Sequence, residues 1–417
     1  MQLTHLTRSI APDQRQVRLT PVHFPGPGAY HYSTQARSVL DLDHLILVSI
    51  LQDKRQNGPG IATPGGMTMG SKGNSSRALV AAGAVLAGAL AARAARSRHE
   101  ELDLRGQVAL ITGGSRGLGL ALSEELGARG CRIAICARDA DELEKASQIL
   151  TSRGVDVYTA RCDVTDRGQV ARLLQDVTAH YGRIDILVAN AGIITVAPLE
   201  ALTTADFDRV MAVNFDGVLN VALGVLPQME RQGSGRIAII SSIGGKVAVP
   251  HLLPYSCAKF AAAGFAEGLR AELAGTGITV TSVYPGLMRT GSHLQAEFGG
   301  DQAEEYDWFA LGASSPYPVA TSATRAARII TAAIQRGDAE CIFPVSALLA
   351  ARVSALFPSA TSALLATVNG FLPAARVAPG QQRFVKGADV KAAAPNPVRD
   401  AATVLGQRAA EQLNQGV

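Results

Sequence analysis

The stretch Gly106–Gly119 reads Gly-Gln-Val-Ala-Leu-Ile-Thr-Gly-Gly-Ser-Arg-Gly-Leu-Gly, and it decides the fold. Val108–Ile111 is an apolar run typical of a buried parallel strand, and the pattern from Leu118 to Arg129 is helical. The turn between them contains three glycines, Gly113, Gly117 and Gly119. Glycine permits positive φ angles and lets a diphosphate approach the amide N–H groups at a helix N-terminus. The stretch therefore predicts a strand, a phosphate-binding turn and a helix.

The spacing Gly113-x-x-x-Gly117-x-Gly119, preceded by Thr112, resembles the short-chain dehydrogenase/reductase family. Four later stretches match the family in the same order: Asn190-Ala191-Gly192, Asn214, Ser242 with Tyr255-Ser-Cys-Ala-Lys259, and Pro285-Gly286. The resemblance covers roughly residues 102–345. It implies a nicotinamide cofactor that contacts the turn residues Thr112, Gly113, Ser115, Arg116, Gly117, Leu118 and Gly119.

The body of the chain, residues 101–345, alternates apolar runs with helical patterns. We expect strands at 107–112, 131–136, 155–160, 184–189, 236–241, 278–284 and 339–343, and helices at about 117–129, 139–152, 166–182, 203–232, 254–275 and 321–336. Strands separated by helices indicate a parallel sheet that is covered on both faces. The predicted class is α/β, and the resemblance implies a Rossmann-type, doubly wound sheet of seven parallel strands.

The predicted catalytic residues begin with Tyr255 and Lys259, which are four positions apart and so share one helix face. An unperturbed tyrosine has a pKa near ~10, and a nearby ammonium favours the phenolate, so we expect Lys259 to lower the pKa of Tyr255. The resemblance implies that Ser242 hydrogen-bonds the substrate oxygen and that Lys259 holds the ribose of the cofactor. It also implies that Asn214 holds a water linking the lysine to solvent. Ser241 is the reserve candidate if the strand ends one residue earlier.

The remaining cofactor contacts follow from the resemblance. Asn190, Ala191 and Gly192 would line the adenine-ribose side of the cleft, and Asp163-Val164 would meet the adenine ring. Pro285, Gly286 and Thr290 would lie beside the nicotinamide amide. Ala189 stands where the family often has a second asparagine.

Two arginines indicate which nicotinamide cofactor the chain prefers. Arg138 follows the second predicted strand, where enzymes that favour NAD carry an acidic residue. Arg116 precedes Gly117, at the other position where NADP-using relatives carry a basic residue. A guanidinium is a planar donor suited to a phosphate, so we expect NADP(H), with NAD(H) as the second possibility. The alternative is that both arginines are solvated and that Asp139 only caps the next helix.

The charge of the chain is unevenly distributed. The 417 residues carry a net charge of +4, but residues 1–100 alone carry 11 Lys/Arg against 5 Asp/Glu. No basic stripe interleaved with aromatic residues occurs, which argues against nucleic acid as a partner. The five cysteines form no Cys-x-x-Cys pair, so we expect no metal site and a reduced, cytoplasmic catalytic domain.

The N-terminal extension divides into two parts. Residues 1–66 have turn clusters and no sustained periodicity, and we expect them to be disordered or non-native, with Met67 or Met69 as a more ordinary start. Residues 67–100 contain the apolar run Ala78–Ala92 between basic flanks. As a helix this run would span about 22 Å, against a ~30 Å hydrocarbon core. A membrane anchor, a cleaved signal peptide and a soluble linker helix are the three interpretations; with an anchor, the following arginines would keep the catalytic domain cytoplasmic.

Three regions flank the predicted cofactor motifs at the C-terminal side. Residues 287–318 break the strand–helix pattern and are predicted to be the substrate loop, either a mobile lid or an ordinary surface loop. Residues 346–373 form two apolar helical segments broken at Pro358, which we expect to pack against the core or a second subunit rather than a membrane. Residues 374–417 are predicted to be a flexible tail.

The predicted activity is therefore that of an oxidoreductase acting on a carbonyl or secondary alcohol, with Tyr255 as acid and base. Apolar residues in the predicted pocket, such as Ile193, Val249 and Leu252, favour an apolar substrate. The family expectation is a homo-oligomer. The alternative from another functional class is a dinucleotide-sensing binding protein on the same fold, without turnover.

Overall fold

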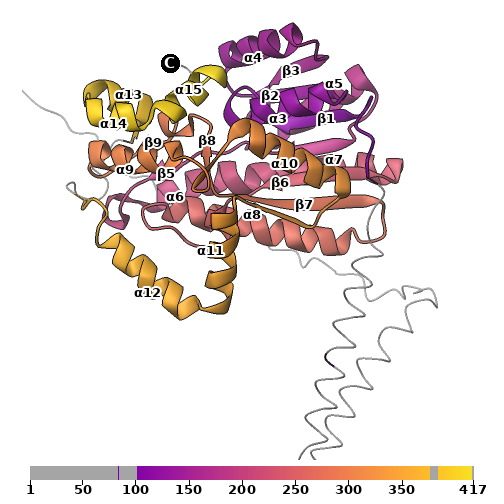
Figure 1. Cartoon of the computed structure of the whole chain (residues 1–417). Helices are drawn as coiled ribbons and strands as arrows, with labels where there is room; N and C mark the ends of the chain where they lie inside the picture. The colour runs from indigo at the N-terminus through magenta and orange to yellow at the C-terminus, as the bar shows by residue number, and fades with distance from the viewer. Residues whose placement is uncertain (1–82, 84–100, 376–383, 416–417) are drawn as a thin grey trace, which may run out of the picture. The chain divides into compact units, whose positions relative to one another are not determined.

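A computed structural model describes Gly83 and residues 101–375 and 384–415. Its centre is a sheet of seven strands in which every neighbouring pair runs parallel (Figure 1). In spatial order the strands are β11 (Glu340–Phe343), β7 (Ile278–Pro285), β6 (Gly235–Ile240), β4 (Ile186–Ala189), β1 (Val108–Thr112), β2 (Arg132–Ala137) and β3 (Val157–Arg161). All seven predicted strands are present within two residues of their predicted bounds.

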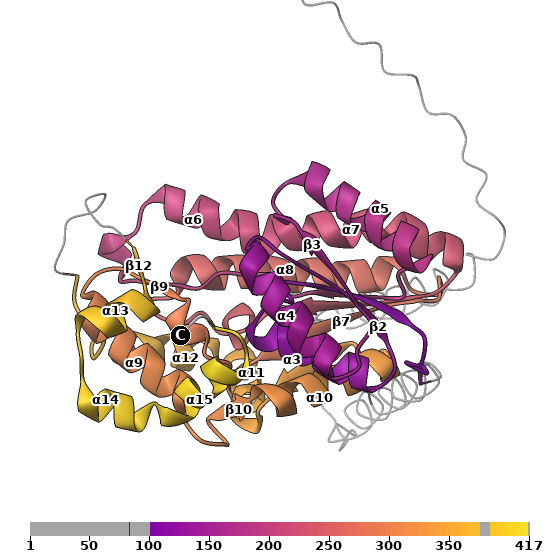
Figure 2. The ribbon, with the colours of Figure 1, turned by 90° about the horizontal axis from the view of Figure 1, so that it is seen from above.

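Helices cover both faces of the sheet (Figure 2). One face packs against α3 (Gly117–Ala128), α4 (Ala140–Ser152) and α10 (Ala323–Arg336), and the other packs against α5 (Arg167–Tyr181), α7 (Gly217–Gln232) and α8 (Leu253–Glu272). Two hydrophobic clusters fill these interfaces, one on each face. Burial on both sides explains why the strands are nearly continuous apolar runs. The predicted Rossmann-type α/β fold is confirmed.

The helix predicted at 203–232 is interrupted near its middle. It consists of α6 (Thr204–Met211), the π-helical turn η2 (Ala212–Asp216) and α7. Within the described residues, only Thr204–Gln232 meets the length and composition of a membrane-crossing helix. This helix buries Val218, Val221 and Val225 in the core beneath the sheet. The composition of a core helix passes the same test, so this finding is weak evidence for a membrane.

Residues 287–318 are more regular than the sequence predicted. They contain β8 (Leu287–Arg289), the 3₁₀ turn η4 (Ser292–Leu294), β9 (Glu297–Phe298) and α9 (Gln302–Ser314). The strand β9 pairs with β5 (Thr195–Val196), and β8 pairs with β10 (Ala320–Ser322). The short 3₁₀ turns η1 (Leu199–Ala201) and η3 (Ile243–Gly245) follow β5 and β6 in the chain. Phe298, Tyr306 and Phe309 form a separate hydrophobic cluster there.

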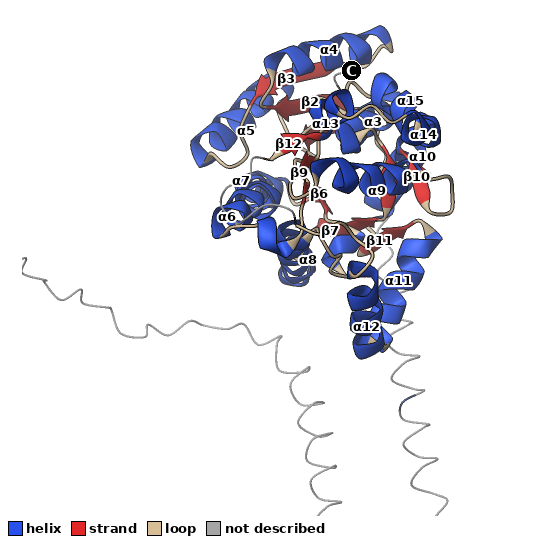
Figure 3. Ribbon diagram, turned by 90° about the vertical axis from the view of Figure 1, so that its left-hand side faces the viewer, coloured by secondary structure: helices blue, strands red, loops and turns tan. Residues whose placement is uncertain are grey.

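The prediction of a flexible tail after residue 373 is wrong for residues 384–415. These residues form β12 (Val385–Lys386), α13 (Gly387–Ala393), α14 (Pro397–Ala402) and α15 (Val404–Gln412), which lie beside α9 (Figures 1 and 3). Val390 and Ala410 are buried in the cluster of α9, and Arg399 pairs with Asp307 of α9 at 3.1 Å. Packing against another element, rather than local sequence pattern, orders this segment.

Two helices occupy the region of the predicted apolar segments, α11 (Val345–Leu356) and α12 (Pro358–Asn369), and Pro358 separates them as predicted. Helix α11 buries Ala347 and Ala351, whereas α12 buries no residue. The expected packing against the core is therefore wrong for α12, and a second subunit stays a prediction. The calls on residues 1–66 and on the run Ala78–Ala92 lie outside the described residues, apart from Gly83, which is helical and exposed.

Candidate active site

The predicted site residues meet at the carboxyl ends of the central strands. The chain order reverses between β1 and β4, and this switch point is where open α/β sheets bind ligands. The glycine-rich turn follows β1, Asn190 follows β4, Ser242 follows β6 by two residues, and Pro285 ends β7. The predicted motifs therefore share one edge of the sheet.

The glycine-rich turn has the geometry that its sequence predicts. Gly113 and Gly117 have φ angles of 65° and 57°, which side chains rarely adopt. A Cβ on Gly119 would lie 2.1 Å from the carbonyl oxygen of Gly113, so no larger residue fits there. The side-chain amide of Asn190 donates to the carbonyl of Thr112 at 3.0 Å. The Thr112 hydroxyl accepts from the backbone N–H groups of Asn190 and Ala191. These bonds join the turn to the Asn-Ala-Gly motif.

Tyr255 and Lys259 lie in the first two turns of α8. Lys259 is buried, and its Nζ donates to the carbonyl of Ile240 at 2.9 Å and lies 5.6 Å from the centre of the Tyr255 ring. Burial disfavours the ammonium and lowers the pKa of Lys259 to about 8. The pair lies on one helix face, as the spacing predicted.

The expectation that the pKa of Tyr255 would be lowered is wrong. Burial of the phenol raises its pKa, and the neighbouring Ser242 side chain offsets only part of this effect. Desolvation is therefore the dominant influence on this phenol, and burial also disfavours the charged form of Lys259. Tyr255 is thus a protonated acid at neutral pH.

Two adjacent serines, Ser241 and Ser242, follow β6 and make different contacts. The Ser241 hydroxyl is buried and donates to the carbonyl of Lys259 at 2.8 Å. The Ser242 hydroxyl accepts from the Gly244 amide at 3.0 Å, and it lies near Tyr255, whose phenolate it favours. Ser242, and not the reserve candidate Ser241, is therefore the serine beside the tyrosine.

Asn214 is fully buried in the π-helical turn η2. Its amide donates to the carbonyl of Ile193 at 2.9 Å, and its oxygen accepts from the Ile193 amide at 2.8 Å. A Cβ on Gly192 would lie 3.0 Å from the Asn214 oxygen and 3.6 Å from the Lys259 nitrogen. Gly192 therefore lies between the asparagine and the lysine. The π turn, often found at functional sites, was not predicted because it changes no periodicity that a sequence displays.

The two arginines that the sequence assigns to the adenosine end of the cofactor, Arg116 and Arg138, have different surroundings. Arg116 pairs with Glu142 of α4 at 2.5 Å, and Ser115 donates to the same carboxylate at 3.0 Å. Arg138 is exposed. Asp139 accepts from the Glu142 amide at 3.0 Å and so caps α4, as the alternative interpretation held for this residue.

The other predicted cofactor residues follow strands β3 and β7. Asp163 follows β3 and accepts from the amide and hydroxyl of Thr165, while Val164 is buried. The Gly286 amide donates to the carbonyl of Phe343 at 2.7 Å. A Cβ on Gly286 would stand 3.0 Å from the Cβ of Ala347. Thr290 is buried, and its carbonyl accepts from Gln415 at 2.8 Å. The sequence did not predict this contact with the C-terminal residues.

A buried dyad near the catalytic helix was also missed. His251 has a φ angle of 62° and contacts Glu305 of α9 at 2.6 Å, and Glu305 also accepts from Trp308 at 2.7 Å. Glu305 is fully buried, so these bonds supply the partners that a buried carboxylate requires. The pair fastens the predicted substrate loop to the segment before Tyr255. An isolated glutamate in an acidic run gives no sequence signal for burial.

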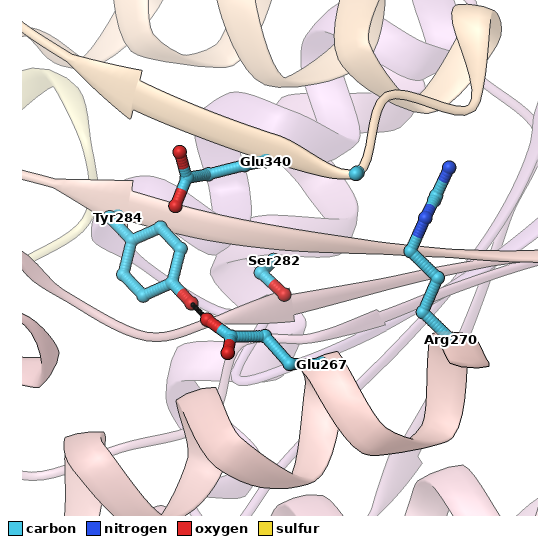
Figure 4. A pocket seen from close by; sticks show the side chains of 6 residues that line it. Glu267, Arg270, Ser282, Tyr284 and Glu340 are labelled. Atoms are coloured by element: carbon cyan, nitrogen blue, oxygen red, sulfur yellow. Dashed lines mark hydrogen bonds between the residues drawn. The ribbon is translucent and has the colours of Figure 1, made fainter. Parts of the chain in front are cut away.

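A pocket of about 210 Å³ lies away from these residues, against the edge of the sheet (Figure 4). It is lined by Glu267 and Arg270 of α8, Ser282 and Tyr284 of β7, and Ala339 and Glu340. The Tyr284 hydroxyl donates to Glu267 at 3.0 Å, and Lys246 bridges Glu267 and Glu340. Arg270 donates to the carbonyls of Val280 and Gly337, so the charged groups of the pocket already have partners, and none of its residues is a predicted site residue.

Comparisons with known proteins identify relatives of this chain. The sequence model of the short chain dehydrogenase family matches residues 107–297. A dehydrogenase/reductase SDR family protein 7-like from Anopheles gambiae is 38% identical over 239 residues, which cover 55% of this chain and 75% of that protein. A putative ketoacyl reductase from Streptomyces coelicolor is 38% identical over 186 residues, 44% of this chain and 71% of that protein.

Solved structures show the same likeness. The crystal structure of levodione reductase superposes with a TM-score of 0.51 and 28% identity, covering 57% of this chain and 96% of that chain. Some other relatives match over a smaller share of their length, in one case only 15%. The matches therefore concern the doubly wound domain.

Proposed function

The chain belongs to the short chain dehydrogenase family, and from this premise we propose that it is an NADP(H)-dependent oxidoreductase that interconverts a ketone and a secondary alcohol. The family membership makes it an NAD(P)-dependent oxidoreductase. The ketone substrate, the preference for NADP(H) and the role of each residue are our proposal. The observation that carries it is that Ser242 and the buried amine of Lys259 both lie beside Tyr255, with the amine 5.6 Å from the centre of the tyrosine ring.

The residues at the switch point fit a nicotinamide dinucleotide. Gly119 leaves no room for a side chain, and the first turn of α3 offers amide donors to a diphosphate. Thr112 and Asn190 hold this turn in place. The cofactor supplies the hydride that is added to the carbonyl carbon, or accepts it in the reverse direction.

The side chains of this chain supply the proton and the orientation. In reduction, Tyr255 donates its hydroxyl proton to the carbonyl oxygen; its raised pKa keeps it protonated at neutral pH. Ser242 donates a hydrogen bond to the same oxygen and opposes the charge that develops on it. The Lys259 ammonium stabilises the phenolate left behind, and Asn214 positions the loop next to this amine. Alcohol oxidation reverses each transfer.

Charge at the adenosine end favours NADP(H). Arg138 is exposed after β2, and Asp139, the nearest acidic residue, is engaged as the cap of α4. An acidic side chain free at this point would repel a ribose phosphate, whereas a guanidinium binds one. Arg116 already pairs with Glu142, so we expect Arg138 to make the larger contribution.

A panel of aliphatic and aromatic ketones, assayed by cofactor absorbance, tests this function. We expect turnover with an apolar ketone and a higher kcat/KM with NADPH than with NADH. Replacing Arg116 and Arg138 together by alanine should raise KM for NADPH roughly 10- to 100-fold, because charge-assisted hydrogen bonds to phosphate are lost, and leave KM for NADH nearly unchanged.

The matched control is Arg231→Ala, which removes an exposed arginine at the end of α7. It should alter neither constant. A wild-type preference for NADH would contradict the assignment of the cofactor. Tight NADPH binding without turnover of any carbonyl compound would instead support the dinucleotide-sensing alternative.

A further inference from the structure

The last described residues of the chain lie on the glycine-rich turn. We call α15 and the three residues after it, Val404 to Gln415, the C-terminal segment. It crosses the α9 end of the molecule and reaches the strand edge where β1 and β7 end (Figures 1 and 2). Leu413 and Gln415 are buried there, although Gln415 lies 125 positions beyond Thr290, the last predicted cofactor residue.

Five hydrogen bonds hold the tip of this segment. The Leu413 carbonyl accepts from the Gly117 amide at 2.9 Å. The Asn414 side chain donates to the carbonyls of Ser115 and Glu142 at 2.9 and 3.0 Å. The Gln415 side chain donates to Thr290 at 2.8 Å, and its carbonyl accepts from Gln295 at 2.7 Å. The tip thus spans from the turn after β1 to the nicotinamide side of the predicted cleft.

One of these contacts occupies the Gly117 amide, a donor that a bound diphosphate would use. Gly117 is the first residue of α3, so its amide is one of the helix-terminal donors that bind phosphates. Leu413 already accepts from that donor. The Gln415 side-chain nitrogen would stand 2.6 Å from a Cβ on Gly117, and so fills the space directly above the turn. A diphosphate and this tip cannot occupy the same place.

The packing under the segment leaves polar groups without partners. Both ring nitrogens of His293, the Ser314 hydroxyl and the Gln415 side-chain oxygen are buried and make no hydrogen bond. Helix α15 covers His293 and Ser314. A Cβ on Gly406 of this helix would stand 2.2 Å from the Ser314 oxygen and 3.0 Å from a His293 ring carbon. Buried polar groups without partners oppose the closed arrangement. These unsatisfied groups oppose the apolar packing of Ala410 and Leu413 and the hydrogen bonds at the tip, which hold the segment in place.

We propose that the C-terminal segment is autoinhibitory: it covers the diphosphate site and must move away before NADP(H) binds. The proposal rests on the proposed function, because it takes the glycine-rich turn as the cofactor site. The apparent affinity for cofactor is then the intrinsic affinity reduced by the fraction of molecules in the open state.

The test compares the full chain with a variant that carries Asn414→Ala and Gln415→Ala. The variant loses three side-chain hydrogen bonds at the tip. A hydrogen bond contributes roughly 2- to 10-fold to an equilibrium constant, so we expect NADPH to bind about tenfold more tightly to the variant in an equilibrium titration. Gln412→Ala is the control, since that side chain is exposed on the same helix, and it should bind NADPH as the wild type does.

Amide hydrogen exchange of residues 404–415 in the wild type gives a second, independent measurement. Addition of NADPH should speed exchange in this segment, because the tip is displaced. Slower exchange with NADPH would mean that the segment closes over the cofactor, and this would overturn the proposal. Equal NADPH affinities of wild type and double variant would overturn it while leaving the proposed function intact. If neither protein binds NADPH or NADH, both the proposed function and the autoinhibition fail.

Discussion

At the scale of the residue, burial shifts the pKa values of Lys259 and Tyr255 in opposite directions. Burial disfavours a charge on either side chain, so the pKa of the amine falls to about 8 and the pKa of the phenol rises. The tyrosine therefore keeps its proton through the pH range in which the lysine loses its own. In our proposal for reduction, the lysine and not the tyrosine sets the alkaline limit of activity.

The pH dependence of ketone reduction follows from these shifts. The Lys259 ammonium predominates below pH about 8 and is lost above it, so kcat should be constant below that pH and fall as the pH rises through it. In Lys259→Arg the guanidinium stays charged, and the fall near pH 8 should disappear even if the overall rate is lower. Lys246→Arg, a matched change on a lysine that pairs with Glu267 and Glu340, should keep it. A fall near pH 8 that persists in Lys259→Arg would contradict the assignment.

The residues that could be predicted are those whose spacing carries the chemistry. Tyr255 and Lys259 share a helix face because they are four positions apart, and Gly119 is required because the turn passes close to Gly113. Contacts that join distant segments have no such signal. Glu305 lies 54 positions from His251, and Gln415 lies 125 positions from Thr290.

At the scale of the element, the seven strands could be predicted because parallel strands that are buried on both faces are apolar runs. Helix α9 was missed since its buried side includes Glu305 and its exposed side includes apolar Leu311. The C-terminal helices were missed because their alanine- and glutamine-rich sequence resembles a tail. Tertiary packing against α9 decides their structure instead.

The packing of α15 over His293 predicts an acid-sensitive stability. Burial, with a smaller contribution from Lys391, lowers the pKa of His293 to about 4, while Tyr306 is the neighbouring ring. Between pH 4 and about 6.5, His293 is protonated in the unfolded chain but neutral in the folded protein. The stability that depends on neutral His293 is therefore fully present above pH about 6.5 and is lost as the pH falls. Between pH 7 and pH 5 the wild type should lose about 2 kcal/mol more of its free energy of unfolding than His293→Gln.

Urea denaturation at the two pH values measures this difference. The exposed His180→Gln serves as the control, and its free energy of unfolding should follow that of the wild type. If the free energies of unfolding of the wild type and His293→Gln depended on pH in the same way, the lowered pKa of His293 would be contradicted.

At the scale of the whole molecule, a doubly wound domain carries a second group of elements at its carboxyl-terminal strand edge. Helix α9, the strands β5, β9 and β12, and helices α13 to α15 cluster there (Figure 3). This group covers the side of the sheet where the predicted motifs meet. In our proposals, substrate choice and access of the cofactor both depend on the parts of the chain whose structure the sequence predicted least well.

The most direct test of the central claim is the rate of ketone reduction by Tyr255→Phe with NADPH. The variant lacks the hydroxyl that donates the proton, so kcat should fall about 10²- to 10⁴-fold, because general acid catalysis contributes on that order. The Kd for NADPH should stay near that of the wild type, which shows that the fold and cofactor site are intact. A kcat within a few-fold of the wild type, measured on protein that binds NADPH normally, would contradict the account.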